Sequence, residues 1–156
     1  MLLSKKKLKK SLTNYDIEAK LSKSKSFRGI FMHNELPKKI KAEESGVVNL
    51  DDSSGNGTHW VAYYNSPRLG YVVYFDSFGL PPSDTIYKYL YTSGKDVYYN
   101  SSQIQDITSV KCGYYVVDFI KHMDKGMDPV DYFYKFVQRP SLDNDQLVTD
   151  GRAIRH

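Results

Sequence analysis

Short apolar runs separated by polar turns predict an alternation of strands and helices along the chain. Runs rich in Val, Ile, Tyr, Phe and Trp predict strands at 27–32, 47–50, 59–65, 69–75 and 96–100. The Ser-Pro-Arg sequence between the third and fourth of these is typical of a hairpin turn. The lysine-rich stretch that ends at Gly46 and the segment 51–57 have the composition of loops.

Helical spacing of apolar residues predicts four helices. They are expected at 15–22, 84–91, 110–123 and 128–138. Thr13 or Asn14 can cap the first helix and Ser83 the second, and the Asp-Pro pair at 128–129 is a common helix start. The third helix is apolar on nearly every side, which favours a buried position. Residues 140–156 are polar, with at most one short turn of helix expected.

Length and charge indicate one globular domain with a basic end. The chain has 156 residues and a formal charge of +4, yet 12 of its 22 Lys and Arg residues lie in the first 41 positions beside only three acids. We expect a basic N-terminal tail at 1–12, one domain at 13–138 and a polar C-terminal segment at 139–156. No run approaches the roughly 20 apolar residues of a membrane span.

The basic tail contains a dense lysine cluster. Its members are Lys5, Lys6, Lys7, Lys9 and Lys10. Such a cluster can contact nucleic-acid phosphates or act as a nuclear-import signal. The alternative interpretation is a solvated terminus without a binding role.

The candidate chemistry centres on the sole cysteine, Cys112, which stands where a polar loop gives way to the buried helix. His59 begins one predicted strand and Asp76 ends the next. A cysteine at a helix start, a histidine and an aspartate form the arrangement of a nucleophilic hydrolase, in which the imidazole activates the thiol and the carboxylate orients the imidazole. Asp51 and Asp52 are weaker alternatives for the acid.

Further residues could complete this site. The side-chain amide of Gln105, seven residues before Cys112, could stabilise an oxyanion together with the cysteine N–H, although Gln103 competes for that role. Gly113 permits close backbone approach of a substrate. Trp60 could line the cleft or fill the core. No metal site is expected, because the chain has one cysteine and no close pair of histidines.

The segments 57–63 and 74–79, together with Gln105, Cys112 and Gly113, resemble the adenovirus-type (adenain-like) cysteine proteases, which share a superfamily with the ubiquitin-like-protein proteases. The resemblance covers about residues 12–138 and is closest to proteases of adenovirus-like viruses and Maverick/Polinton elements. It implies an α+β fold with a papain-like core in permuted order. A central buried helix would carry the nucleophile at its N-terminus against a mixed, mainly antiparallel sheet.

The resemblance also implies a function. Cys112 would be the nucleophile, His59 the base and acid, Asp76 the orienting group and Gln105 an oxyanion donor. The substrates would be viral or mobile-element structural precursor proteins, cleaved during virion maturation in the host nucleus, the cytoplasm or the virion. No cofactor is required, although DNA or a peptide could activate the enzyme. A disulfide-linked activating peptide of the adenovirus kind is not expected, because the chain has no cysteine other than Cys112.

Two other functions remain open at the level of sequence. An isopeptidase that removes ubiquitin or a related modifier would use the same chemistry in a different cleft. A non-enzymatic DNA-binding or capsid-associated protein would use the lysines and the many tyrosines, with Cys112 as an inert core residue.

Overall fold

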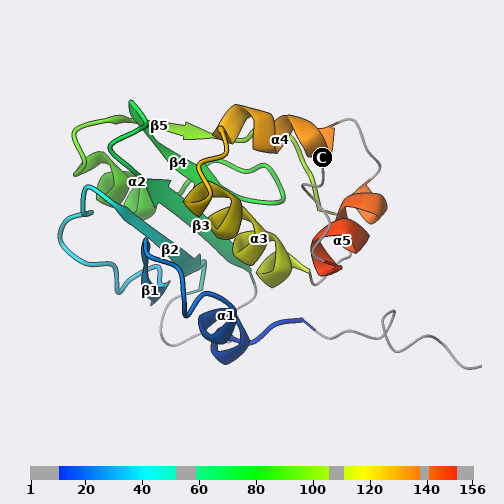
Figure 1. Cartoon of the computed structure of the whole chain (residues 1–156). Coiled ribbons are helices and arrows are strands. Elements are labelled where there is room, and N and C mark those ends of the chain that lie inside the picture. The colour runs from blue at the N-terminus through cyan, green and yellow to red at the C-terminus, as the bar shows by residue number, and fades with distance from the viewer. Residues whose placement is uncertain (1–10, 52–58, 106–110, 138–140, 151–156) are drawn as a thin grey trace, which may run out of the picture.

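The computed structural model describes residues 11–51, 59–105, 111–137 and 141–150. These residues form five strands and five helices, arranged as a mixed sheet with helices on both faces (Figure 1). The strands are β1 (Phe27–Met32), β2 (Glu44–Asn49), β3 (Trp60–Asn65), β4 (Tyr71–Phe75) and β5 (Asp96–Tyr99). The helices are α1 (Asn14–Lys20), α2 (Asp84–Tyr91), α3 (Cys112–Asp124), α4 (Pro129–Val137) and α5 (Ser141–Thr149).

The sheet has the strand order β1-β2-β3-β4-β5. The two inner pairings, β2 with β3 and β3 with β4, are antiparallel, whereas the outer pairings, β1 with β2 and β4 with β5, are parallel. The expected α+β class with a mixed sheet and a buried helix that begins at the cysteine is confirmed. Antiparallel pairing is confined to the inner strands, where the short 66–70 connection joins β3 directly to β4.

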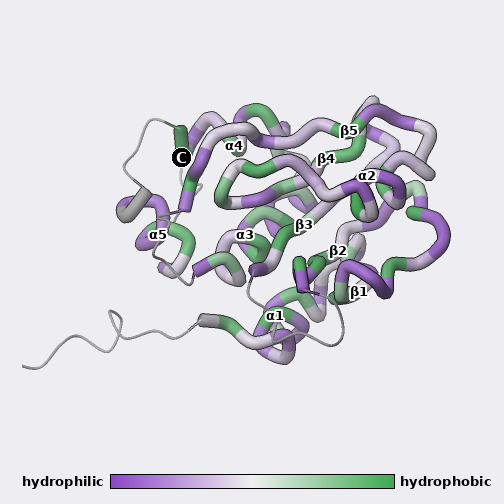
Figure 2. The backbone as a smooth tube through the Cα atoms, turned by 180° about the vertical axis from the view of Figure 1, so that it is seen from behind, coloured by the Kyte–Doolittle hydropathy of each residue, from purple (hydrophilic) through white to green (hydrophobic). Residues whose placement is uncertain are grey.

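Strand alternation divides the core into two layers. Ala62 and Tyr64 of β3 belong to the apolar cluster that contains α3 and α4, whereas Val61 and Tyr63 face the cluster that contains α2. Figure 2 shows the hydrophobic stretches concentrated in the central strands and in α3. The third strand is therefore buried on both faces, which holds its first residues in a fixed position.

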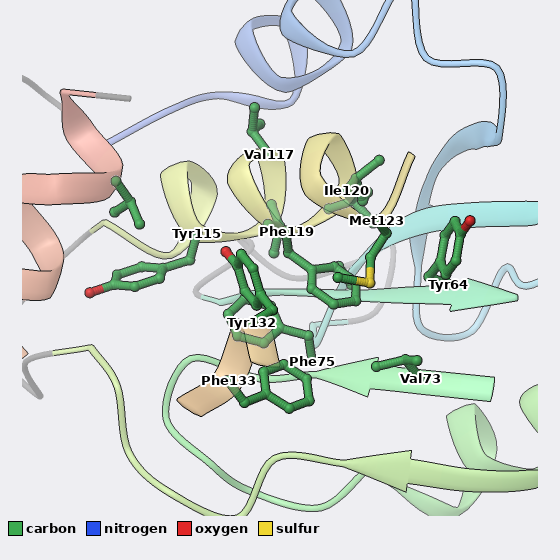
Figure 3. Packing of buried hydrophobic residues seen from close by; sticks show 14 of the residues in the cluster. Tyr64, Val73, Phe75, Tyr115, Val117, Phe119, Ile120, Met123, Tyr132 and Phe133 are labelled. Carbon is green, nitrogen blue, oxygen red and sulfur yellow. The ribbon is translucent and has the colours of Figure 1, made fainter. Parts of the chain in front are cut away.

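Aromatic stacking fixes α3 on the sheet. The Phe75 ring lies 4.9 Å from that of Phe119 in α3 and 5.7 Å from that of Phe133 in α4, measured between centroids and with nearly parallel planes in both cases (Figure 3). Stacked and edge-on aromatic pairs stabilise a core beyond the area that they bury. Because Phe75 is the last residue of β4, this packing also fixes the chain just before Asp76.

Most predicted elements are shifted by one or two residues at an end, and two differ more from their sequence-based predictions. Strand β2 begins at Glu44 rather than Val47, because the Glu44 carboxylate is fully buried and accepts hydrogen bonds from Tyr63, Tyr89 and Arg28. The expected short turn at the C-terminus is the nine-residue helix α5. The helix was not predicted because its sequence has no clear apolar face. Its buried contacts with the core are largely polar.

Helix α5 packs against α3. Asn144 donates hydrogen bonds to the carbonyls of Ile104 and Phe136, Asp145 accepts one from Tyr115, and Val148 joins the core. The residues from 141 to 150 thus lie against the domain expected at 13–138. In the part of the chain that the structure describes, no helix has the length and apolar character needed to cross a membrane.

Candidate active site

Cys112 is the first residue of α3 and is 7% exposed. Lys111, at the N-cap, makes no side-chain capping hydrogen bond, and the first turn contains no acidic residue. The first N–H groups of a helix have no acceptor within the helix, so this N-terminus presents donors and the positive end of the helix dipole near the thiol. It is a suitable place for a developing negative charge.

His59 lies directly before β3, with its ring buried beside Asp76 and Phe78. Its backbone carbonyl accepts a hydrogen bond from Leu50 N at 3.0 Å. Its Nε2 lies 2.7 Å from Asp76 Oδ1, and its ring stacks on Phe78 at 4.5 Å between centroids. Since Nε2 is engaged by the carboxylate, Nδ1 is the ring nitrogen left to face the thiol.

The environment of His59 favours the protonated imidazole. Burial by itself lowers the pKa of His59, but hydrogen bonds with Asp76 and Cys112, and the charges of these two groups, raise the pKa to about 9. The imidazole therefore carries a proton at neutral pH. This protonation state suits the transfer of a proton to a leaving group.

Asp76 follows β4 and is held by both its backbone and its carboxylate. Its Oδ1 accepts from Phe78 N at 2.9 Å as well as from His59. Asn100, which follows β5, accepts from Asp76 N at 3.1 Å and donates to Asp76 O at 2.7 Å. The Asn100 side chain thus extends the hydrogen bonding between β4 and β5 by one residue. These two bonds fix the backbone position from which the Asp76 carboxylate reaches His59.

Gly79 closes the turn that begins at Asp76. Its N–H donates to Asp76 O at 2.8 Å, and its φ is +75°. A Cβ at this position would lie 2.6 Å from the carbonyl carbon of Ser102. The glycine therefore lets the turn at 76–79 contact the backbone of the loop that leads to Gln105.

Substituting Gly79 by alanine is expected to lower the free energy of unfolding by about 3 kcal/mol, from left-handed backbone strain and the contact with Ser102. Gly94→Ala is the matched control, because Gly94 has a similar φ of +79° but open space around its Cβ position. That variant should lose only about 1 kcal/mol. Urea unfolding measures both; equal losses would contradict a specific role for the Ser102 contact.

Gln105 is fully buried beside Ser77. The Ser77 hydroxyl donates to Gln105 Oε1 at 2.5 Å, and Ser77 O accepts from Gln105 N at 2.9 Å. Gln103, the competing candidate, donates from Nε2 to Gln105 O at 2.9 Å. Gln103 therefore supports the backbone of Gln105, and the turn that carries Asp76 also reaches Gln105.

Other expected site residues have different surroundings. Trp60 is partly exposed and packs against the α3-side core, in keeping with both of its interpretations. Gly113 is closely approached by Leu12, whose Cβ would lie 2.9 Å from a Cβ at position 113. His59 pairs with Asp76 rather than Asp51. Asp52 and the cluster Lys5, Lys6, Lys7, Lys9 and Lys10 lie outside the described residues.

Three supporting residues were missed by sequence reasoning. Ser77 and Phe78 belong to the turn that follows Asp76, and Asn100 follows β5. Ser and Asn are common in turns, and Phe is common in cores, so residue type alone gave no reason to select them. For Ser77 and Phe78, the position directly after the candidate acid was the available signal, whereas the sequence offers none for Asn100. Among the described residues, no group of three or more His, Cys, Asp or Glu side chains is arranged to hold a metal ion.

Comparison with known proteins gives a likeness in fold. No family model and no curated protein matches the sequence. The crystal structure of ASFV pS273R protease matches with a TM-score of 0.61 and 17% identity, over 93% of this chain and 67% of that chain. Its selenomethionine form matches with a TM-score of 0.50 and 19% identity, over 74% of this chain and 45% of that one.

A weaker likeness is to SUMO protease Ulp1 with its catalytic cysteine oxidised to a sulfinic acid. The TM-score is 0.42 and the identity 19%, over 72% of this chain and 55% of that chain. The stronger match alone establishes the fold. The chain thus has the α+β fold of ASFV pS273R protease, in which His59 is hydrogen-bonded to Asp76 and interacts with Cys112, the first residue of α3.

Proposed function

We propose that this chain is a cysteine endopeptidase that cleaves structural precursor proteins of a virus or mobile element during particle maturation. The observation that carries the proposal is the chain of contacts from Cys112 through His59 to Asp76. A thiol at a helix N-terminus, beside an imidazole that is itself oriented by a carboxylate, is suited to acyl transfer. The fold shared with ASFV pS273R protease supports the assignment.

The first half of the proposed reaction forms an acyl-enzyme. The Cys112 thiolate attacks the carbonyl carbon of the scissile amide, and the carbonyl π electrons move to oxygen. Gln105 Nε2 and the Cys112 N–H would donate to this oxyanion. When the tetrahedral intermediate collapses, the C–N bond breaks and the His59 imidazolium gives its proton to the leaving amine. A thioester on Cys112 remains.

The second half regenerates the enzyme. His59, now neutral, takes a proton from water as the water oxygen attacks the thioester carbon. Collapse of the second tetrahedral intermediate breaks the C–S bond and releases a carboxylic acid. Asp76 holds the Nε2 side of the imidazole throughout, so that Nδ1 exchanges protons with the reacting groups.

The same chemistry cleaves an isopeptide bond, so the competing activity is removal of ubiquitin or a related modifier.

The endopeptidase activity is tested with a peptide library derived from a whole proteome. The library is digested with and without DNA and analysed for new N-termini. Ubiquitin and SUMO carrying C-terminal electrophiles test the isopeptidase, and the Cys112→Ala protein controls both. Library cleavage without probe labelling supports the proposal. Labelling without library cleavage favours the isopeptidase, and the absence of both contradicts a peptidase.

A further inference from the structure

An oxyanion donor of the amide type has an orientation problem. The side-chain amide of glutamine has a donor nitrogen on one side and an acceptor oxygen on the other. Only the nitrogen stabilises a negative oxygen, whereas the oxygen would repel it. A glutamine that serves an oxyanion hole therefore needs a neighbour that distinguishes its two ends.

Ser77 is that neighbour of Gln105. Its hydroxyl donates to Gln105 Oε1 at 2.5 Å, and both side chains are almost completely buried. The carbonyl of Ser77 accepts the N–H groups of Ile104 at 2.8 Å and of Gln105 at 2.9 Å. The same serine thus holds the backbone of Gln105 and one end of its amide.

Contacts from other segments hold the backbone around Gln105. Gln103 Nε2 donates to Gln105 O at 2.9 Å, and Asn144 Nδ2 donates to Ile104 O at 3.2 Å. The Cβ position of Gly79 lies against the backbone of Ser102 in the same loop. With the backbone held in this way, the orientation of the Gln105 amide depends on the contacts of its own side chain.

The Ser77 hydroxyl favours one of the two amide orientations. In the arrangement present, the hydroxyl hydrogen has an acceptor and Gln105 Nε2 lies on the side of the amide away from Ser77. After a flip, Nε2 would donate to Ser77 Oγ, and the hydroxyl hydrogen would lose this acceptor in a buried environment, which costs free energy. The flip would also turn Oε1 to the side where Nε2 now lies.

We propose that Ser77 is a positioning residue of the oxyanion hole, whose hydroxyl holds Gln105 Oε1 so that Nε2 donates to the substrate oxyanion. The proposal rests on the function proposed above. It gives the residue directly after the candidate acid a separate role, because Asp76 orients the imidazole whereas Ser77 orients the amide.

Peptide cleavage by Ser77→Ala, Gln105→Ala and the double variant tests this role. Ser77→Ala is expected to lower kcat about tenfold with KM unchanged, since one hydrogen bond no longer selects the amide orientation. Gln105→Ala is expected to lower kcat by about 10²-fold. The double variant should equal Gln105→Ala, because Ser77 acts only through the amide. The alkylation rate of Cys112 by iodoacetamide should be unchanged in all three.

Ser26→Ala is the matched control, because Ser26 is also buried and its hydroxyl donates to Asp124 Oδ1 at 2.5 Å, outside the candidate site. It should affect unfolding without changing kcat. Three results would overturn the proposal: an unchanged kcat in Ser77→Ala, an equal loss in the Gln105→Ala background, or a parallel fall in alkylation. The last would show that Ser77 acts through Asp76 and His59.

A second measurement does not depend on turnover. A peptide aldehyde with the sequence that precedes the cleaved bond of a library peptide adds to the Cys112 thiolate. An S–C bond forms, the carbonyl π electrons move to oxygen, and His59 supplies the proton of the resulting hemithioacetal. The affinity of the aldehyde should be about tenfold lower for Ser77→Ala than for the wild type. The double variant should bind it as Gln105→Ala does, because the amide is already absent. An unchanged affinity in Ser77→Ala contradicts the proposal. Absence of wild-type peptide cleavage would instead contradict the proposed endopeptidase, so the two failures are distinguishable.

Discussion

Cys112→Ala is expected to reduce kcat/KM for peptide cleavage by at least about 10⁴-fold, because the acyl-enzyme cannot form without the thiol. Cys112 is buried and small, and alanine fits its place without a new contact. The free energy of unfolding should fall by no more than about 1 kcal/mol. Progress curves with a cleaved library peptide and urea unfolding measure the two effects.

Cys112→Ser separates chemistry from packing. Serine preserves the shape of the side chain, yet a hydroxyl is far less easily ionised than a thiol and should remain nearly inactive. Cleavage in Cys112→Ala at more than a hundredth of the wild-type rate would exclude Cys112 as the nucleophile. A large loss of stability in both variants would instead assign the thiol to the core.

Asp76→Asn is the second variant with a large expected effect, a fall in kcat/KM of about 10³-fold or more. The neutral amide no longer stabilises the imidazolium, so the pKa of His59 should fall from about 9. The pH profile shows the direction. In the wild type, kcat/KM should decline as the pH rises through about 9, where His59 loses the proton required by the leaving amine. In the variant, this decline moves to lower pH.

The pH dependence of Cys112 alkylation can be compared with that of kcat/KM in the same protein. Iodoacetamide needs only the thiolate, so its rate should not decline above about pH 9. Asp145→Asn is the matched variant, because Asp145 is also buried and accepts a hydroxyl hydrogen bond, from Tyr115 at 2.5 Å. It should leave the pH profile unchanged. An unshifted alkaline limb in Asp76→Asn would refute the orienting role of Asp76.

Local signals predicted the elements whose ends are determined by nearby residues. Helix α2 begins after Ser83, whose hydroxyl accepts from Ile86 N at 3.3 Å, and ends at Tyr91 as predicted. Strand β1 also has its predicted bounds, 27–32. The predicted start of β2 was wrong because the burial of Glu44 depends on hydrogen-bond partners 16, 19 and 45 residues away. A local sequence pattern does not contain this information.

The candidate site shows the same division between local and long-range information. Cys112, His59 and Asp76 were identifiable because each is a chemically reactive residue type that lies at the end of a predicted buried strand or helix. Ser77, Phe78 and Asn100 act through contacts whose partners are set by the register of β3, β4 and β5. Their roles became visible only once the sheet brought these segments together.

The turn from Asp76 to Gly79 has a consequence for how the site tolerates change. Within four successive residues it supplies the carboxylate, the hydroxyl that holds Gln105, the ring beneath His59 and the glycine against Ser102. A one-residue insertion or deletion there would displace all four groups together. In a deep mutational scan this stretch should therefore appear as an unbroken intolerant block.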